Sequence, residues 1–197
     1  MDEKLNFLLP KRKKEQNVLL LRDPIDNELF KIFINAAETT YKYKQDLKCA
    51  QLRIGYTILF YVGLRVNEIR FLQARDIQDA IKTLQFNVIH FKQRESNIHV
   101  ILDVAARELK KLKCYNDIIF VKYKYKYLFG KDKPIDQKTL IRNINKDLKH
   151  TCQINEISYN IKSHNFRINM ISKLLQNTLV QDAAEIIRYK DIKSTMA

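Results

Sequence analysis

The stretch SHNFR at residues 163–167, followed by the largely apolar run 168–176, is the feature around which we expect this chain to be organised. Ser163 is a favourable N-cap, and it would place His164 and Arg167 in the first turns of a helix. Residues three apart are neighbours on one helical face. Arginine offers a fixed fork of donors and histidine can move a proton near neutral pH, so the pair could grip an anion. The same pattern also fits a solvated helix end.

The composition favours a polyanionic partner. The chain has 197 residues, a hydrophobic fraction of 46% and a formal net charge of +14. It is therefore long and apolar enough for a full core, as one domain or a domain and a half. A balance this basic points most simply to nucleic acid, although a lysine-rich composition can also leave many lysines without a partner.

Cysteine, histidine and glycine usage excludes several kinds of site. The three cysteines (Cys49, Cys114 and Cys152) form no CxxC pair and the four histidines have no metal-ligand spacing, which indicates a reduced intracellular compartment and no zinc site. With three glycines there is no glycine-rich phosphate loop, so nucleotide-dependent chemistry is disfavoured. No apolar run is long enough for a membrane span and no secretory signal is evident.

Periodicity predicts a mainly helical chain with a small antiparallel sheet. A β-hairpin is expected from strands at 83–91 and 98–102, with Lys92 at its tip, and a short third strand at 118–121. Gly63 should end a buried helix in a left-handed conformation. The expected helices cover 24–37 (begun by Asp23 and Pro24), 47–62, 64–69, 103–113, 136–149, 163–176 and 179–189, with another starting at 191. Asp136 should cap the helix 136–149, with Leu140, Ile144 and Leu148 inward and Lys138, Arg142, Lys146 and Lys149 outward.

Several charged residues have both a structural and a functional interpretation. Arg65 falls at the junction of two helices predicted to be buried, where Glu68 could pair with it; the pair is either purely structural or a device that holds a functional arginine. The basic cluster with Lys11, Arg12 and Lys13 could touch a DNA backbone or remain a solvated tail. Lysine and tyrosine alternate over 122–126, as in nucleic-acid clamps and also in mobile loops.

Four segments together resemble the tyrosine recombinases, the phage-integrase family. Residues 61–69, YVGLRVNEI, resemble the family's TGLRxxEl box, and residues 164–167, HNFR, resemble its HxxR box. Lys92 matches the catalytic lysine in the turn between two strands. Residues 184–195 resemble the segment iqellGHsdisTT. The four occur in the family's order, and the resemblance covers nearly all of the chain from Leu21 on.

The sequence also departs from the family pattern. Tyr189 stands where the family usually has His or Trp, and Arg188 replaces the preceding glycine. By the resemblance, the nucleophilic tyrosine would come about three residues after Thr195, which is one position beyond Ala197. The separate N-terminal DNA-clamping domain has no room before Leu21. We therefore expect a basic entry segment at 1–20 and a recombinase catalytic domain at 21–197 that stops just before its nucleophile.

The resemblance implies a fold, a reaction and a partner. The fold would be α+β and mainly α-helical, with a three-stranded antiparallel sheet on one edge. The reaction would be site-specific breaking and rejoining of double-stranded DNA through a 3′-phosphotyrosyl link, without metal or cofactor. The family assembles as tetramers on DNA, whereas this chain alone is expected to be a monomer, not membrane-bound, in the cytoplasm, nucleoid or a DNA-containing organelle. The implied catalytic residues are Arg65, Lys92, His164, Arg167 and Tyr189, supported by Glu68, with DNA contacts from Lys11, Arg12, Lys13 and Arg94.

Other functions remain open on sequence grounds. The first is a non-catalytic DNA-binding relative that keeps the phosphate clamp but lacks the nucleophile. The second is a type IB topoisomerase, which shares the chemistry and the core fold. The third is a basic RNA-binding protein in which all four motif matches are coincidental.

Overall fold

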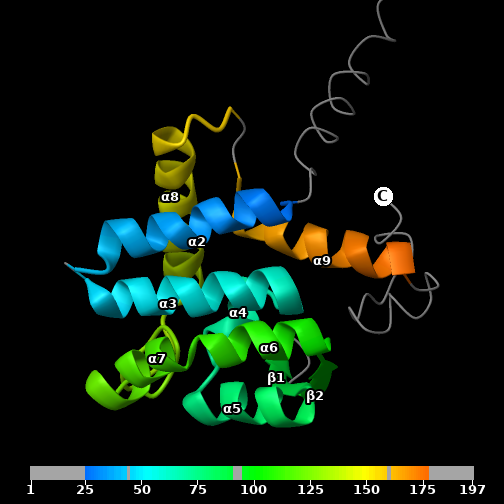
Figure 1. Cartoon of the computed structure of the whole chain (residues 1–197). Helices are drawn as coiled ribbons and strands as arrows, with labels where there is room; N and C mark the ends of the chain where they lie inside the picture. Colours follow the sequence, from blue (N-terminus) through cyan, green and yellow to red (C-terminus); the bar gives the residue numbers. More distant parts are fainter. Residues whose placement is uncertain (1–24, 44, 91–94, 159–160, 178–197) are drawn as a thin grey trace, which may run out of the picture.

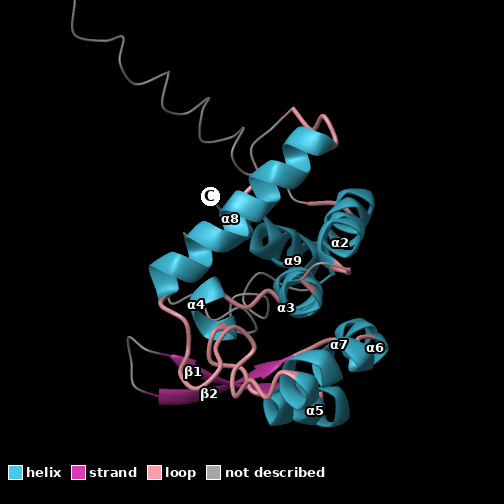
Figure 2. Cartoon of the chain, turned by 90° about the vertical axis from the view of Figure 1, so that its left-hand side faces the viewer, coloured by secondary structure: helices cyan, strands magenta, loops and turns pink. Residues whose placement is uncertain are grey.

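The computed structural model describes residues 25–43, 45–90, 95–158 and 161–177. Figure 1 shows α2, α3, α8 and α9 gathered in one part of the molecule and α5, α6, α7 and the β-hairpin in the other. The view in Figure 2 separates the same two groups, with α4 between them. The elements are α2 (Asn27–Tyr41), α3 (Asp46–Thr57), the π-helix η1 (Ile58–Val62), α4 (Val66–Ile69), α5 (Ala74–Thr83), β1 (Gln85–His90), β2 (Glu95–Val100), α6 (Asp103–Lys111), α7 (Lys113–Asn116), the π-helix η2 (Asp117–Lys122), α8 (Gln137–Ile154) and α9 (Ser163–Asn177).

The first described helix begins later than the sequence predicted. We expected it to start at Asp23 and Pro24 and to end near Ala37. Instead α2 starts at Asn27, because the side chain of Asp26 accepts a hydrogen bond from the Leu29 amide at 2.7 Å and so caps the helix. Residues 23 and 24 lie outside the described part of the chain.

The buried helix that ends at Gly63 is confirmed. α3 continues directly into η1, and both are largely buried, with Ile54, Ile58 and Phe60 at most 1% exposed. Gly63 closes the π-helix with a φ of +73°, and its amide donates to the Ile58 carbonyl at 3.1 Å. A left-handed residue at this position lets the chain turn sharply into α4.

The predicted hairpin is present, but the predicted third strand is wrong. β1 and β2 pair antiparallel from Gln85 opposite Val100 to His90 opposite Glu95. Phe86 and Val88 face the core while Gln85 and Asn87 are exposed, as the alternation predicted. Residues 118–121 instead belong to η2, so the sheet in the described residues has two strands. A short apolar run such as IIFV fits a buried helix as well as a strand.

Helices α8 and α9 complete the core. Asp136 caps α8, as predicted, through the Thr139 amide at 2.9 Å, and the helix runs past the expected end at Lys149 to Ile154. Phe166 of α9 is fully buried and stacks on Tyr56 of α3, with ring centroids 5.4 Å apart. Burial of such a ring contributes about 1.5–3 kcal/mol, so it fixes the N-terminal half of α9 against the buried helix. The expected helices at 179–189 and from 191 lie outside the described residues.

Candidate active site

Arg167 is buried and bound to the turn that precedes Arg65. Its side chain is almost fully enclosed, with the residue 4% exposed, and its Nη1 donates a hydrogen bond to the carbonyl oxygen of Gly63. Gly63 and Arg167 are 104 positions apart in the sequence. The bond therefore brings the HNFR segment to within two residues of Arg65, and it uses one of the five N–H donors that a guanidinium carries.

Arg65 and Glu68 form the predicted ion pair at the start of α4. The Arg65 amide donates to Glu68 Oε2 at 2.6 Å, and its Nη1 donates to Oε1 at 2.9 Å. The side chain of Glu68 is 6% exposed, whereas that of Arg65 is 42% exposed. Contrary to the expectation of a buried arginine, the buried carboxylate anchors a cationic head that reaches solvent. This arrangement leaves Arg65 able to meet a ligand from outside.

The start of α9 is held by asparagines. We expected Ser163 to cap this helix, but Ser163 is its first residue. The cap contact comes from Asn165, whose Oδ1 accepts from the Lys162 amide at 3.0 Å, while Asn145 of α8 accepts from the Ser163 amide at 2.9 Å. Neither residue was predicted from the sequence to hold this helix. Asn165 stands at the third position of the helix, from which a polar side chain can reach back to the amide of the cap residue, and this position was the available signal.

His164 and Arg167 share the first turns of α9 but differ in burial. His164 is exposed at the second position of the helix, whereas Arg167 is buried. The exposed imidazole of His164 is therefore accessible from solvent, whereas the guanidinium of Arg167, one turn later, lies in the interior. Arg65 and His164 thus supply exposed groups, and Arg167 a buried one, around the Gly63 turn.

Close packing at Gly63 fixes how near α9 lies to the turn between η1 and α4. A Cβ added at this glycine would lie 2.8 Å from Cγ of Met170, one turn after Arg167. Only a residue without a side chain allows Met170 to sit so near the turn, and this closeness lets Arg167 reach the Gly63 carbonyl. From the sequence, Gly63 was predicted only to end a helix, and its contact with Met170 was not predicted.

The remaining predicted site residues lie outside the described residues. They are Lys11, Arg12, Lys13, Lys92, Arg94 and Tyr189. Lys92 and Arg94 fall in the connection between β1 and β2, since the last paired residues are His90 and Glu95.

A row of basic side chains runs along the outer face of α8. Lys138, Arg142, Lys146 and Lys149 are all exposed, as predicted, and they recur at helical spacing while Leu140, Ile144 and Leu148 face the core. Such a row is complementary to a line of negative charges. Within the described residues there is no cluster of His, Cys, Asp and Glu able to hold a metal ion and no helix long and apolar enough to cross a bilayer.

Comparisons with known proteins found a matching family model and solved structures with a similar fold. A family model described as the phage integrase family matches residues 26–197. The fold is similar to the crystal structure of XerA recombinase, with a TM-score of 0.63 and 16% identity over 88% of this chain and 58% of that one. XerH site-specific recombinase bound to difH substrate has a TM-score of 0.60 and 13% sequence identity, over 88% of this chain and 49% of that one. Lambda integrase residues 75–356, as a dimer bound to a COC′ core site, has a TM-score of 0.61 and 14% sequence identity, over 88% of this chain and 60% of that one.

This chain therefore spans about half to three fifths of the solved recombinase chains that it resembles. No curated protein sequence matches it.

Proposed function

Since this chain belongs to the phage integrase family, we propose that it is the catalytic domain of a site-specific DNA recombinase that works through a 3′-phosphotyrosyl intermediate. The observation that carries the proposal is the hydrogen bond between Arg167 and the Gly63 carbonyl, beside the Arg65–Glu68 pair. This contact supports the proposal because it holds Arg167 of α9 at the turn that comes two residues before Arg65. The solved relatives bound to difH and COC′ core sites support double-stranded DNA as the substrate.

Arg65 and Arg167 are proposed to bind the scissile phosphate together, and we call this pair the phosphate grip. A tyrosine hydroxyl attacks phosphorus, the bond to the 5′-oxygen breaks, and negative charge builds on the non-bridging oxygens in the transition state. Arg65 and Arg167 would stabilise that charge, since both can be held in place before the substrate arrives. Glu68 positions Arg65 from beneath without covering its exposed head. Two preorganised guanidinium groups supply the positive charge, so the proposed step requires neither a metal nor a nucleotide.

The proton transfers would fall to the other motif residues. Lys92 is proposed to protonate the leaving 5′-oxygen, and His164 to assist proton transfer at the nucleophile or to hold the phosphate. Tyr189 is not assigned a proton transfer: its hydroxyl is proposed to donate a hydrogen bond to a phosphate oxygen in place of the family's His or Trp. The nucleophile itself would be the tyrosine that the family alignment puts soon after Thr195.

DNA binding would extend beyond the scissile phosphate. The exposed basic row on α8 (Lys138, Arg142, Lys146 and Lys149) is proposed to lie along the sugar-phosphate backbone, with further contacts from Lys11, Arg12, Lys13 and Arg94. Assembly into a tetramer is proposed to require DNA, with a monomer when DNA is absent.

A suicide substrate tests the proposal. A duplex selected by binding from a randomised pool is nicked so that the cleaved 5′-end diffuses away, and is incubated with the protein encoded by the complete reading frame. We expect a covalent protein–DNA adduct on a denaturing gel, absent from the Arg167→Ala variant. The matched control is Arg75→Ala, because Arg75 is a surface arginine with a side chain 75% exposed.

Two other outcomes would point elsewhere. Specific binding with no adduct would favour the non-catalytic relative, a function consistent with the departures at Arg188 and Tyr189. An adduct that forms equally with Arg167→Ala would contradict the proposed grip.

A further inference from the structure

A cavity of about 400 Å³ opens between the start of α3, the segment 123–135 and α8. Its lining combines buried Leu52, Leu140 and Ile144 with the exposed polar residues Gln45 and Asn143. This volume lies in the range of ligand-binding pockets, and an apolar base with a few polar groups at the edge is their usual lining. Nothing in the proposed recombination chemistry uses this cavity.

The walls of the cavity are held by hydrogen bonds. Gln51 Nε2 donates to the Leu128 carbonyl at 2.8 Å, and the Leu128 amide donates to the Leu72 carbonyl at 2.8 Å. Asp46 accepts hydrogen bonds from Lys122 and from the Tyr123 hydroxyl. The contacts of Gln51 and Asp46 tie residues 122–128 to α3, and the contact with Leu72 ties Leu128 to the segment between α4 and α5, so the cavity is held by hydrogen bonds of the chain itself.

The segment that forms one wall is strongly basic. Residues 122–133 read KYKYKYLFGKDK, with five lysines against one aspartate. All five lysines are exposed, whereas Tyr123 and Phe129 from the same segment line the cavity. The alternation noted in the sequence therefore separates two roles: the lining aromatic residues shape the cavity and the lysines form a charged track beside it.

We propose that the cavity and this lysine track bind an acidic peptide segment of a partner protein. One aromatic or aliphatic side chain would enter the cavity, and flanking carboxylates would meet the lysines other than Lys122, which pairs with Asp46. A single chain can supply both features, and the charges are complementary. Duplex DNA would also meet the lysines, but it has no apolar group for the cavity unless a base is flipped out, at a cost of a few kcal/mol.

Fluorescence anisotropy with a defined probe tests the proposal. The probe is a fluorescein-labelled peptide with a central phenylalanine between two runs of four glutamates, and the matched peptide has alanine at the centre. We expect the alanine peptide to bind about tenfold or more weakly, because burial of a phenylalanine contributes about 1.5–3 kcal/mol. The double variant Lys124→Glu/Lys126→Glu should lose binding similarly. Absence of binding, or equal binding of both peptides, would overturn the proposal.

A blocking variant separates the cavity from the charged track. Asn143→Trp places a large side chain at the cavity edge and should abolish the advantage of the phenylalanine peptide, whereas the control Gln78→Trp, on exposed α5 surface, should not. In ¹H–¹⁵N spectra the side-chain amides of Gln51 and Asn143 should shift on peptide addition. If a short duplex displaces the peptide and itself binds Lys124→Glu/Lys126→Glu more weakly than the unaltered protein, DNA is the ligand of the track and the peptide proposal is wrong.

Discussion

The guanidinium of Arg167 donates a hydrogen bond to the carbonyl oxygen of Gly63, across 104 positions of sequence. This contact joins the start of α9 to the turn between η1 and α4, two residues before Arg65. Because the carbonyl belongs to the backbone, this bond ties the position of Arg167 to the shape of the turn. The turn itself depends on a glycine with a φ of +73°.

Replacing Gly63 should therefore damage both stability and the site. In Gly63→Ala the new Cβ would lie 2.8 Å from Met170 Cγ, in a left-handed conformation. The conformation alone costs about 1–2 kcal/mol, and displacement of Met170 adds to it. We expect urea unfolding to show at least this loss of unfolding free energy.

A second buried glycine, Gly55, provides a matched control. A Cβ at Gly55 would also meet a neighbour at 2.8 Å, but that neighbour is the end of the Phe129 ring, and Gly55 lies within a helix. Alanine is favoured over glycine in helices by about 1 kcal/mol, which offsets the contact. If Gly55→Ala proved more destabilising than Gly63→Ala, the argument from the left-handed turn would be wrong.

Loss of the Glu68 charge should destabilise the start of α4. Glu68 accepts from both the amide and the guanidinium of Arg65, and Glu68→Gln keeps one acceptor oxygen for two donors. We expect a loss of about 1–3 kcal/mol in urea unfolding, the cost of an unsatisfied buried group. The control is Glu28→Gln, which breaks an exposed pair with Lys31 and should change stability by about 0.5 kcal/mol or less. Equal effects of the two variants would argue against a buried anchor.

Asp147 links three helices through two tyrosines. The carboxylate is buried, and it accepts hydrogen bonds from Tyr41 at 2.6 Å and from Tyr56 at 2.7 Å. Burial, together with the neighbouring Asp147 carboxylate, raises the pKa of both hydroxyls, so they remain protonated donors. Tyr56→Phe should cost about 1–3 kcal/mol by leaving a buried oxygen unpaired.

The two tyrosines should also be coupled. In a double-mutant cycle, Tyr41→Phe and Tyr56→Phe should differ from additivity by about 0.5 kcal/mol or more, since both donate to one carboxylate. Strict additivity would indicate that the two hydrogen bonds act independently.

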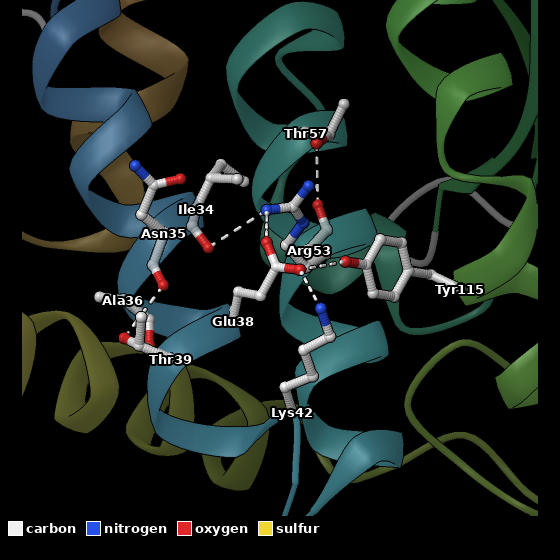
Figure 3. A network of polar contacts seen from close by, with 9 residues as sticks. All are labelled: Ile34, Asn35, Ala36, Glu38, Thr39, Lys42, Arg53, Thr57 and Tyr115. Carbon is white, nitrogen blue, oxygen red and sulfur yellow. Dashed lines mark hydrogen bonds and ion pairs between the residues drawn. The ribbon is translucent and has the colours of Figure 1, made fainter.

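Acid should destabilise the protein partly through Glu38. Figure 3 shows this carboxylate between Lys42, Arg53 and Tyr115, with hydrogen bonds of 3.1, 3.1 and 3.2 Å. The hydrogen bond from Lys42, assisted by the charges of Arg53 and Lys42, lowers the pKa of Glu38 below its ordinary 4.5. A carboxylate whose pKa is lower in the folded state stabilises the protein above its unfolded pKa, and that contribution is lost as the pH falls through the folded value.

Glu38→Gln should consequently lose stability less steeply than the unaltered protein from about pH 5 downward. Asp76 provides the opposite case, because burial raises the pKa of its carboxyl group. Its contribution appears as the pH falls, so Asp76→Asn should make the acid loss steeper. Urea midpoints measured across this pH range check both signs, and parallel curves for all three proteins would contradict the assignment.

The basic row on α8 should contribute to DNA affinity through phosphate contacts. Arg142→Ala and Lys146→Ala should each weaken binding to all duplexes alike and reduce the slope of log affinity against log salt by about 1. The control is Lys31→Ala, on the exposed face of α2, which should leave the slope unchanged. Unchanged slopes for both α8 variants would remove this helix from the DNA interface.

Local chemistry made much of the fold predictable. A glycine after a buried run predicted the turn at Gly63, and an aspartate before an amphipathic run predicted the cap at Asp136. Strict alternation of apolar and polar residues at 85–88 predicted strand β1. The apolar run 118–121 misled because it is too short to show a period. α5 was not predicted, although Ile77 and Ala80 form its buried side.

The site was less predictable than the fold. The motifs indicated Arg65, Glu68, His164 and Arg167, and the Arg65–Glu68 pair followed from their spacing along a helix. The Gly63–Arg167 contact could not be read from periodicity, because it depends on how α9 packs against η1 through Phe166 and Met170. Burial is set by such tertiary packing, which is why Arg65 proved exposed and Arg167 buried.

The central claim is that Arg65 and Arg167 act as one phosphate grip, and a ligation assay tests it without any nucleophilic tyrosine. One strand of a duplex is nicked, with a 3′-p-nitrophenyl phosphodiester on one side of the nick and a free 5′-hydroxyl on the other. Attack of the hydroxyl oxygen on phosphorus forms the strand joint, breaks the bond to the aryl oxygen and releases p-nitrophenolate, which absorbs visible light.

We expect this chain to accelerate the release, and Arg65→Ala and Arg167→Ala each to slow it about 10²–10³-fold, the loss typical of one oxyanion donor. Arg75→Ala should match the unaltered protein, and circular dichroism should establish that each variant is folded. Acceleration that survives loss of either arginine in a folded variant would contradict the account.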